Sequence, residues 1–332
     1  MSPVAAHPLV SVVVPLHNGG ATVERTLASI SGQTWREMEV VVVDDGSTDD
    51  GSERVRAAAQ RDPRVRLIRQ PNAGVAAARN AGAAVTRGDY LAFVDADDLW
   101  SPEKIELQMA AMSAGGPSVG LVYTWAALID AEDRIYSLEH RPQAEGRVLR
   151  ELCRANLVGN GSSPLIRRQA FEQVGGYDAS LRARGAQGCE DLMIYLRLAE
   201  AHEFRVVRRH LTGYRVTQGN MSSNALGMLR SCELTLETFR ARYPQYEAEY
   251  QAHRRDMVYW LLARAMTTGP LSNAAALLTQ HGFLNAFELF DRLGDLAWLT
   301  VKARTPMPLK ILAQRMLRQG GAFRPAFLEA AL

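Results

Sequence analysis

The sequence predicts an α/β fold in which a doubly wound, mixed sheet carries helices on both faces. Short β-branched runs alternate with amphipathic stretches over residues 10–94, and strands spaced by helices pair in parallel through right-handed crossovers. From Val119 to Leu138 the pattern is strand-like without helical spacers, and beyond about Asn224 only helical periodicity is left. We therefore expect one domain over residues 1–222 and an all-α C-terminal region over residues 223–332.

The individual elements follow from local patterns. Residues 10–14 are continuously apolar and β-branched, as expected of a strand buried on both faces. The next stretch places Val23, Leu27 and Ile30 on one helical face, and Ser101 and Pro102 predict the cap and first turn of a later helix. We expect strands at 10–14, 39–43, 65–69, 90–94, 164–166, 204–207 and 211–216, and helices at 21–30, 50–60, 74–85, 149–155 and 191–201.

Composition and charge exclude several classes of protein. With 332 residues, 47% of them hydrophobic, the chain can bury a substantial core, and its net charge of +2 argues against a dedicated nucleic-acid binder. Cys153, Cys189 and Cys232 form no CxxC pair, so we expect neither a disulfide framework nor a zinc site. No apolar run is long enough for a signal peptide or a membrane span, and we expect a cytoplasmic protein.

Two acidic turns follow predicted strands. Asp44 and Asp45 come after residues 39–43, and Asp95 and Asp97 come after residues 90–94, at the strand ends where open α/β sheets bind ligands. The Asp-x-Asp spacing offers oxygen ligands that suit Mg²⁺ or Mn²⁺, and a carboxylate at Asp45 can accept from the imide N–H of a pyrimidine. The alternative for Asp95 and Asp97 is a solvated acidic turn, and the alternative for Asp44 and Asp45 is a plain Asp-Gly-Ser turn.

Two further segments carry polar residues at predicted helix starts. Asp191, after Glu190, can act as a general base because an ordinary Asp is ionised at neutral pH; the alternative is that the helix dipole alone favours acids there. Residues 72–82 are rich in small side chains that permit close helix–sheet packing, and they match neither a Walker A loop nor a dinucleotide fingerprint. Within them, Arg79 can bind a phosphate through two hydrogen bonds.

In order and spacing these segments resemble the family 2 glycosyltransferases, inverting enzymes of the GT-A fold. The similarity covers roughly residues 9–222. It rests on Val-Ser-Val-Val-Val-Pro15-Leu-His-Asn18, Val-Val-Val-Asp44-Asp45-Gly-Ser-Thr-Asp, Asn72-Ala-Gly-Val-Ala-Ala-Ala-Arg79-Asn80, Phe93-Val-Asp95-Ala-Asp97-Asp98, Gly175-Gly-Tyr-Asp178 and Glu190-Asp191.

The resemblance implies a nucleoside-diphosphate sugar, UDP- or dTDP-linked, as the donor and a hydroxyl group as the acceptor. By position, Pro15, Asn18 and Asp45 would border the nucleobase, with Arg79 nearby. The loop at residues 159–163 would lie near the diphosphate and the acceptor. The acceptor would belong to a surface polysaccharide, a lipid-linked glycan or another glycoconjugate.

The resemblance also implies a metal and a base. Asp97 would ligate Mn²⁺ or Mg²⁺, Asp95 would face the ribose and the metal, and Asp191 would deprotonate the acceptor hydroxyl. This agrees with the chemistry of glycosyl transfer, which passes through an oxocarbenium-like state. The departing nucleoside diphosphate gains negative charge that a metal offsets as a Lewis acid, and a single displacement inverts the anomeric centre.

Three departures from the family pattern qualify the resemblance. His17 stands where Tyr is frequent, and Thr217 and Gln218 stand where a His that approaches the metal or diphosphate is frequent. The second departure weakens the expectation of a metal contact from that side. The Gln-x-x-Arg-Trp signature of processive polysaccharide synthases is absent. Single-sugar transfer is therefore favoured over polymerisation.

The C-terminal stretch 302–324 contains six basic residues and no acidic ones, with Leu309, Leu312 and Met316 on one helical face. A basic amphipathic helix can lie on an anionic membrane, which would attach the protein to the inner face of the membrane. The alternative is an apolar stripe packed on the catalytic domain with a solvated basic face.

Two other functions are compatible with parts of the pattern. A sugar nucleotidyltransferase also needs an α/β sheet and metal-binding Asp residues, but its triphosphate would require a basic loop after the first strand, and no Lys or Arg occurs there before Arg25. A non-catalytic nucleotide-sugar-binding module would tolerate Thr217, whereas intact Asp95, Asp97 and Asp191 argue against it.

Overall fold

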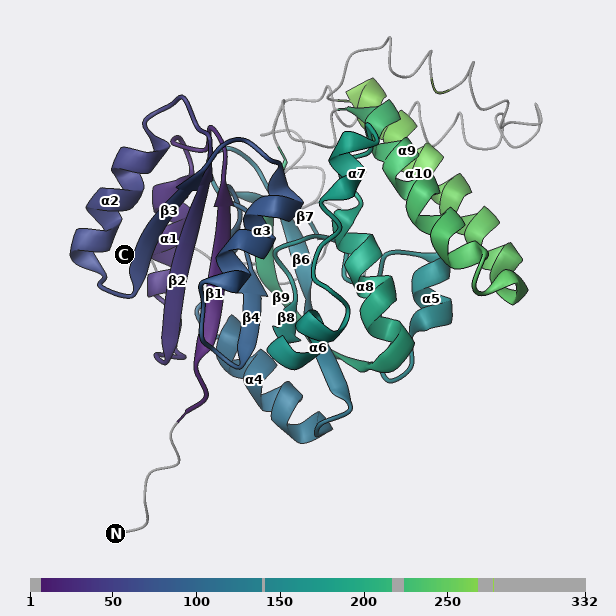
Figure 1. Ribbon diagram of the computed structural model, residues 1–332, viewed down its shortest axis with the longest axis horizontal. Helices are drawn as coiled ribbons and strands as arrows, with labels where there is room; N and C mark the ends of the chain where they lie inside the picture. Colours follow the sequence, from purple (N-terminus) through teal and green to yellow (C-terminus); the bar gives the residue numbers. More distant parts are fainter. Residues whose placement is uncertain (1–6, 139–140, 217–223, 268–276, 278–332) are drawn as a thin grey trace, which may run out of the picture.

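The computed structural model describes residues 7–138, 141–216, 224–267 and 277. Its centre is a nine-stranded mixed sheet in the order β3-β2-β1-β4-β8-β6-β9-β5, with β7 paired to β6 (Figure 1). The strands are β1 Val10–Leu16, β2 Met38–Asp45, β3 Val65–Gln70, β4 Tyr90–Phe93, β5 Leu99–Trp100, β6 Val119–Ile129, β7 Ile135–Leu138, β8 Leu165–Arg167 and β9 Glu203–Arg215.

Helices cover both faces of this sheet. Within the described residues they are α1 Val23–Ser31, α2 Gly51–Arg61, α3 Val75–Ala84, α4 Lys104–Gly115, α5 Leu149–Arg154, α6 Arg168–Gln173, α7 Ser180–Ala183, α8 Glu190–Ala201, α9 Ala225–Arg240 and α10 Glu247–Thr267. A short 3-10 helix, Pro244–Tyr246, joins the last two. Figure 1 shows α9 and α10 lying together at the far side of the molecule from β1–β3.

The first half of the sheet is parallel, as the alternation of strands and helices predicts. The strand β1 lies between β2 and β4 and pairs in parallel with both. Because successive side chains of a strand point to opposite faces, its apolar residues supply two cores. Val13 belongs to the core covered by α3, α5 and α8, whereas Val12 belongs to the core covered by α1, α2 and α4.

The second half of the sheet is mixed. The strand β8 runs antiparallel to both β4 and β6, and β9 runs parallel to β6. The prediction of two short strands at 204–207 and 211–216 was wrong, because both belong to the single strand β9. Its pairing with β6 shifts register between Thr124 and Ala126, where the paired residues of β9 step from Val207 to His210 and then to Thr212.

The predicted helix start at Ser101 was also wrong. The helix α4 begins at Lys104, and Glu103 is its cap without a side-chain hydrogen bond. The Ser101 carbonyl instead accepts from the Lys104 backbone N–H at 3.0 Å and from Gln33 Nε2 at 2.8 Å. Ser101 therefore joins the end of β5 to the segment after α1 and caps nothing with its side chain.

The helices that follow the sheet share its core. Cys232, Leu236 and Phe239 of α9 belong to the same buried cluster as Phe93 of β4 and Leu192 of α8. The expected boundary near residue 223, together with Thr217 and Gln218, lies outside the described residues, so the division into two domains stays a prediction. The segment 302–324 also lies outside them. In the described part of the chain, no helix combines the length and the apolar character that crossing a membrane requires.

Candidate active site

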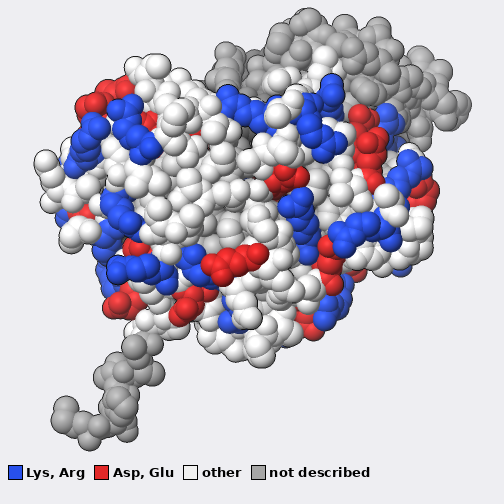
Figure 2. Space-filling model, viewed as in Figure 1, with Lys and Arg blue, Asp and Glu red and all other residues white. Residues whose placement is uncertain are grey.

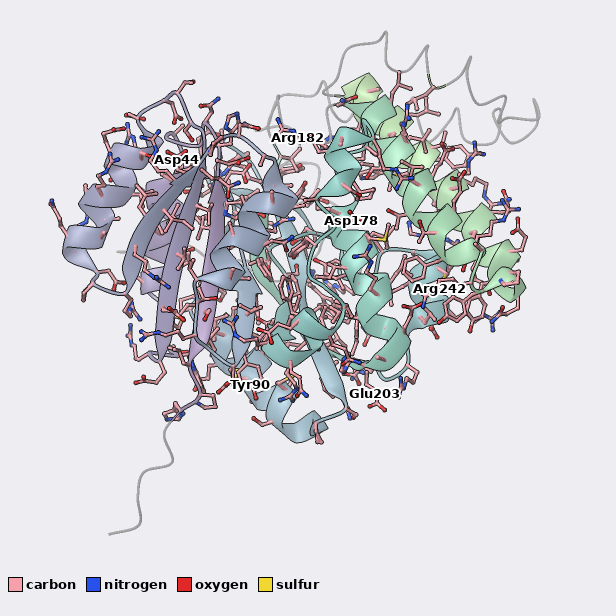
Figure 3. The ribbon with its side chains drawn as sticks, viewed as in Figure 1. Asp44, Tyr90, Asp178, Arg182, Glu203 and Arg242 are labelled. Carbon is pink, nitrogen blue, oxygen red and sulfur yellow. The ribbon has the colours of Figure 1, made fainter. Side chains whose placement is uncertain are left out.

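The carboxyl ends of β1, β2 and β4 meet at one edge of the sheet. Pro15 pairs with Val43 of β2, and Val13 pairs with Phe93 of β4, so Asp95 lies level with Pro15. Figure 3 shows Asp44 at this edge and Tyr90, where β4 begins, at the opposite one. Parallel pairing thus brings together loops that are far apart in the sequence.

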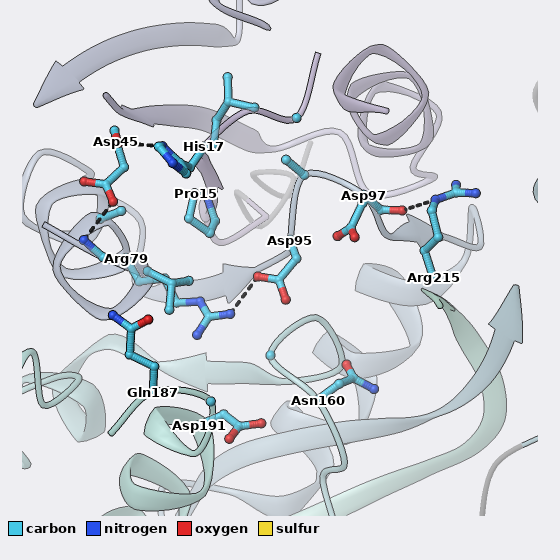
Figure 4. Close-up of a pocket in the computed structure, with 18 of the residues that line it drawn as sticks. Pro15, His17, Asp45, Arg79, Asp95, Asp97, Asn160, Gln187, Asp191 and Arg215 are labelled. Atoms are coloured by element: carbon cyan, nitrogen blue, oxygen red, sulfur yellow. Dashed lines mark hydrogen bonds and ion pairs between the residues drawn. The ribbon is translucent and has the colours of Figure 1, made fainter. Parts of the chain in front are cut away.

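A cavity of about 910 Å³ opens at this edge (Figure 4). Its size falls within the range of small-molecule sites. All residues to which the sequence assigned a role line it, namely Pro15, Asn18, Asp45, Arg79, Asp95, Asp97 and Asp191. The structure therefore brings the predicted residues together, while the role of each stays a prediction.

Asp45 and Asn18 shape the end of the cavity at β1 and β2. The Asp45 carboxylate accepts hydrogen bonds from the backbone N–H groups of Ala73 and Gly74, both at 2.8 Å, and from Gln70 Nε2 at 2.7 Å. Asn18 adopts a left-handed backbone with φ of 52°, and its Oδ1 accepts from the Thr48 N–H at 2.9 Å. These bonds fix the loops after β1, β2 and β3 against one another.

His17 completes this end of the cavity. One ring nitrogen lies 3.0 Å from the Asp45 carbonyl oxygen, and the ring also contacts the Asn72 side-chain amide at 3.1 Å. The imidazole therefore packs across the mouth of the β2 loop. A residue that the sequence marked only as a departure from the family pattern is thus part of the wall.

Arg79 is held by carboxylates inside the protein. It is 2% exposed, its two terminal nitrogens lie 2.6 Å from Asp95 and 3.0 Å from Glu190, and the guanidinium lies over the Tyr177 ring at 5.1 Å. The sequence suggested a phosphate as its partner, whereas the structure pairs it with two acids. Arg79 therefore ties α3, the β4 loop and the start of α8 into one unit.

The Asp-x-Asp loop is braced from two sides. Ser162 Oγ donates to Asp98 Oδ2 at 2.5 Å and accepts from the Asp95 backbone N–H at 3.0 Å. The buried Arg215 donates from Nε to the Asp97 carbonyl at 2.6 Å and from its backbone N–H to Asp98 Oδ1 at 2.8 Å. Asp98 is thus a structural acid that orients the loop.

Burial and neighbouring charges raise the pKa of two carboxyl groups in this loop. Burial, followed by the neighbouring Asp95 carboxylate, raises the pKa of Asp97 to about 6, and burial with the charges of both neighbours raises the pKa of Asp98. A divalent cation would favour the ionised form of such a pair. The donor set fits Mg²⁺ or Mn²⁺, which bind hard oxygen ligands.

No cluster of three or more metal-ligating side chains occurs in the part of the chain that the structure describes. The expected ligands are two side chains, Asp95 and Asp97, and their role stays a prediction. That number suffices for Mg²⁺, which in phosphate-transfer sites takes one or two carboxylates and fills its other positions with water and substrate oxygens.

Asp191 faces the same cavity from the first turn of α8. Burial, followed by the charge of Glu190, raises its pKa to about 7, although Arg79 acts in the opposite direction. Its Oδ1 accepts from the Leu192 backbone N–H at 2.6 Å. The arrangement gives a carboxyl group that is oriented by its helix and that can exchange a proton near neutral pH.

Several lining or bracing residues were missed by sequence reasoning. Ser162 and Arg215 act on the Asp-x-Asp loop, and Met228 and Trp260 line the cavity from α9 and α10. Arg182 after the start of α7 also lines it, and Figure 2 shows basic side chains gathered at this end of the molecule. The Ser-rich loop 159–163 was a usable signal for Ser162, whereas the other contacts exist only in the folded chain.

Comparison with known sequences gives a family. Residues 11–175 match the family described as Glycosyl transferase family 2. The chain is 43% identical over 99 residues to the uncharacterized glycosyltransferase YibD of Escherichia coli, covering 30% of this chain and 29% of that protein. It is 35% identical over 199 residues to the O-antigen biosynthesis protein RfbC of Myxococcus xanthus, covering 58% and 15%. The matches thus span less than a third of either relative.

Solved structures share the fold. The mannosyltransferase PcManGT from Pyrobaculum calidifontis, in complex with GDP-Man and Mn²⁺, has a TM-score of 0.56 at 22% identity and covers 94% of this chain and 89% of that one. TarS 1-349 of S. aureus in complex with UDP-GlcNAc has a TM-score of 0.57 at 16% identity, covering 89% and 90%. These likenesses confirm the predicted fold class, a mixed α/β sheet flanked by helices with a GT-A-like arrangement.

Proposed function

The chain belongs to glycosyltransferase family 2 through residues 11–175, and from this premise we propose that it is a metal-dependent, inverting enzyme. It moves a single sugar from a nucleoside-diphosphate sugar to a hydroxyl acceptor. The observation that supports this most directly is that Asp95, Asp97 and Asp191 line one cavity although they are far apart in the sequence. One cation site and one base within a shared space are what the reaction requires.

In the proposed reaction Asp191 accepts the proton of the acceptor hydroxyl. The oxygen attacks the anomeric carbon as the bond from that carbon to the diphosphate oxygen breaks, and the nucleoside diphosphate departs with the bonding electrons. A cation bound by Asp95 and Asp97 would offset the charge on this leaving group as a Lewis acid. Arg79, held between Asp95 and Glu190, keeps the two acidic loops at a fixed separation.

The donor would lie between the β1 and β2 loops and the Asp-x-Asp loop. Pro15, Asn18 and Asp45 would border the base. The Asp45 carboxylate already accepts three hydrogen bonds from residues 70–74. UDP or dTDP as the nucleotide is supported by the UDP-GlcNAc bound to TarS, whereas PcManGT binds GDP-Man. Arg182 at the rim supplies positive charge for the diphosphate.

The product is proposed to be a surface polysaccharide or another glycoconjugate. RfbC, with which the chain shares 35% identity over 199 residues, is an O-antigen biosynthesis protein. A lipid-linked acceptor would accord with the suggested membrane contact of residues 302–324, which stays a prediction.

Two substitutions test the proposal. Asp191→Asn keeps the size of the side chain but removes its basicity, so transfer should fall by about 10²-fold or more while nucleotide affinity stays unchanged. Asp97→Ala should weaken Mn²⁺-dependent binding of UDP by about tenfold or more. The measurements are product formation by chromatography and calorimetric titration of UDP with and without Mn²⁺.

Asp89→Asn is the matched control, because Asp89 is exposed just before β4, at the opposite edge of the sheet. It should change neither measurement. Full activity of Asp191→Asn would reassign the base, and equal UDP affinity with and without Mn²⁺ in the natural sequence would remove the metal from the proposal.

A further inference from the structure

We propose that α9 and α10 build an acceptor subsite, in which Trp260 forms a shelf for the ring face of a saccharide acceptor. This inference rests on the proposed glycosyl transfer and names the class of its acceptor. It concerns residues beyond the matched segment 11–175. The acceptor would be a glycan that presents a pyranose ring, rather than a simple alcohol or a protein hydroxyl.

Trp260 is in the catalytic cavity and open to solvent. Its exposed fraction is 42%, and it lines the same cavity as Asp191. Val85, at 41%, is the other large hydrophobic residue that is exposed among the described residues, and it does not line the cavity. Single exposed apolar side chains are ordinary on a protein surface, but a Trp at the wall of a polar cavity has a position that suits ligand contact.

The ring is held in place by its own helix. The Arg264 guanidinium, one turn further along α10, lies over the indole at 5.6 Å from the ring centroid. Leu261 and Leu262, the next two residues of α10, are buried in a small core shared by α9 and α10. The indole is therefore anchored to a packed helix pair, and a fixed ring loses little conformational entropy when it binds a ligand.

The cavity that Trp260 lines is also lined by the loop that carries the proposed base. Met228 of α9 lines the cavity together with Trp260, and a Cβ built on Gly188 would lie 3.3 Å from Met228 Cγ. Gly188 precedes Cys189, Glu190 and Asp191. An acceptor resting on Trp260 would thus share one cavity with Asp191, the residue proposed to deprotonate its hydroxyl group.

The chemistry of the shelf favours a sugar. One face of a pyranose ring carries C–H groups that pack on an aromatic ring, while its hydroxyl groups need polar partners such as those that line the rest of the cavity. A nucleobase could also stack on an indole, but the proposed base-binding residues lie on β1 and β2, at the side of the molecule away from α10 (Figure 1). In this proposal the nucleobase therefore occupies the end of the cavity at β1 and β2, and the acceptor sugar occupies the end at α10.

The test uses the full chain loaded with UDP and Mn²⁺. The probes are methyl α- and β-pyranosides of glucose, galactose, mannose and N-acetylglucosamine, and their binding is followed by saturation-transfer NMR. We compare Trp260→Ala and Trp260→Phe with the natural sequence, and Val85→Ala is the matched control for an exposed apolar side chain outside the cavity.

The expected result is that at least one pyranoside binds. Its dissociation constant should rise about tenfold in Trp260→Ala, rise little in Trp260→Phe because an aromatic face is kept, and stay unchanged in Val85→Ala. Affinity for UDP and Mn²⁺ should be the same in all four proteins. Pyranoside binding that is indifferent to Trp260→Ala, or no pyranoside binding at all, overturns the inference.

Hydrolysis of a UDP-sugar without acceptor separates this inference from the proposed function. This reaction needs the donor site but no acceptor, so it reports on the proposed transfer in the natural sequence independently of pyranoside binding. Trp260-dependent pyranoside binding without hydrolysis of any nucleotide sugar would contradict the proposed transfer and keep the saccharide shelf. Hydrolysis of a nucleotide sugar together with pyranoside binding that does not depend on Trp260 would contradict the saccharide shelf and keep the proposed transfer.

Discussion

At the scale of single residues, the charge of the cavity is organised around one buried guanidinium, that of Arg79. Arg79 pairs with Asp95 and Glu190, so one guanidinium holds two neighbouring acids. Asp191 lies next to Glu190, and its pKa rises to about 7 because burial and the charge of Glu190 outweigh Arg79. Removing Arg79 would leave buried carboxylates unpaired, which is far more costly than never having had the pair.

The pKa of Asp191 predicts the pH dependence of transfer. A base must be deprotonated, and a raised pKa keeps Asp191 protonated below about pH 7, so kcat/KM should fall about tenfold for each further unit of acidification. An ordinary Asp, with a pKa near 3.9, would keep the rate constant down to about pH 5. The measurement is kcat/KM for transfer in buffers that span this range.

Burial is the largest cause of that raised pKa, and Glu190→Gln tests the next one, the charge of Glu190. The substitution removes the negative charge that raises the pKa of Asp191 while Arg79 stays in place, so the acid limb of the profile should move to lower pH. Glu200→Gln, near the other end of α8, is the control and should leave the limb where it is. An acid limb that does not move in Glu190→Gln would mean that another group controls the rate.

Two loops act together at the scale of elements. The Asp-x-Asp loop after β4 and the loop 159–163 before β8 are joined by Ser162, which bonds to Asp98 and to the Asp95 backbone. Trp100 of β5 strengthens the junction, because its indole N–H donates to the Ser162 carbonyl at 2.9 Å. The geometry of the proposed metal site therefore depends on Ser162, which is not one of the proposed metal ligands.

Ser162→Ala should loosen this junction. It removes the hydrogen bonds of Asp98 Oδ2 and of the Asp95 N–H, while Asp98 Oδ1 still accepts from the Arg215 N–H. The loss of these partners costs about 1–3 kcal/mol. We expect Mn²⁺-dependent UDP affinity to fall several-fold, measured by calorimetric titration, while the circular dichroism spectrum stays unchanged. Ser118→Ala is the control because its hydroxyl bonds only to Glu203 at the surface. Unchanged UDP affinity in Ser162→Ala would show that the loops are positioned independently.

Local patterns were sufficient for most elements. The strands β1 to β4 and the helices between them follow from continuous apolar runs and amphipathic spacing, and the structure places their ends within a few residues of the predicted ones. Where the prediction failed, a local signal competed with pairing. The pattern was interpreted as two short strands, 204–207 and 211–216, but pairing with β6 keeps β9 continuous. Ser101 suggested a cap, but its carbonyl is used by Lys104 and Gln33.

The site was predictable only in part for a related reason. Acids after predicted strands indicated Asp45, Asp95 and Asp97, and an acid at a predicted helix start indicated Asp191; the structure brings all four to one cavity. The partner of Arg79 was not predictable, because Glu190 reaches it from a helix more than a hundred residues later in the chain. Contacts of this kind depend on how β8 and α8 return to the parallel half of the sheet.

At the scale of the whole molecule, one buried cluster joins the sheet to the helices that follow it. Phe239 and Cys232 of α9 are fully buried in the core that also contains Phe93 of β4 and Tyr195 of α8. A contiguous core normally unfolds as one unit. The helical region proposed to begin at residue 223 is therefore expected to stabilise the sheet as well as to line the cavity.

Phe239→Ala tests this coupling. Loss of a buried Phe side chain costs about 3–5 kcal/mol, and in a shared core the whole described fold should lose that stability together. Native-state hydrogen exchange is the measurement, because it reports the opening free energy of each amide. Amides of β1 and β4 should lose as much protection as those of α9.

Leu262→Ala is the matched control for a local effect. Leu262 is buried only in the small cluster formed by α9, α10 and Leu277, which contains no residue of the sheet. Its replacement should reduce protection in α10 and leave β1 nearly as protected as before. If Phe239→Ala gave this same local pattern, the helices would be an independent unit, and the catalytic sheet would owe its stability to residues 1–222 alone.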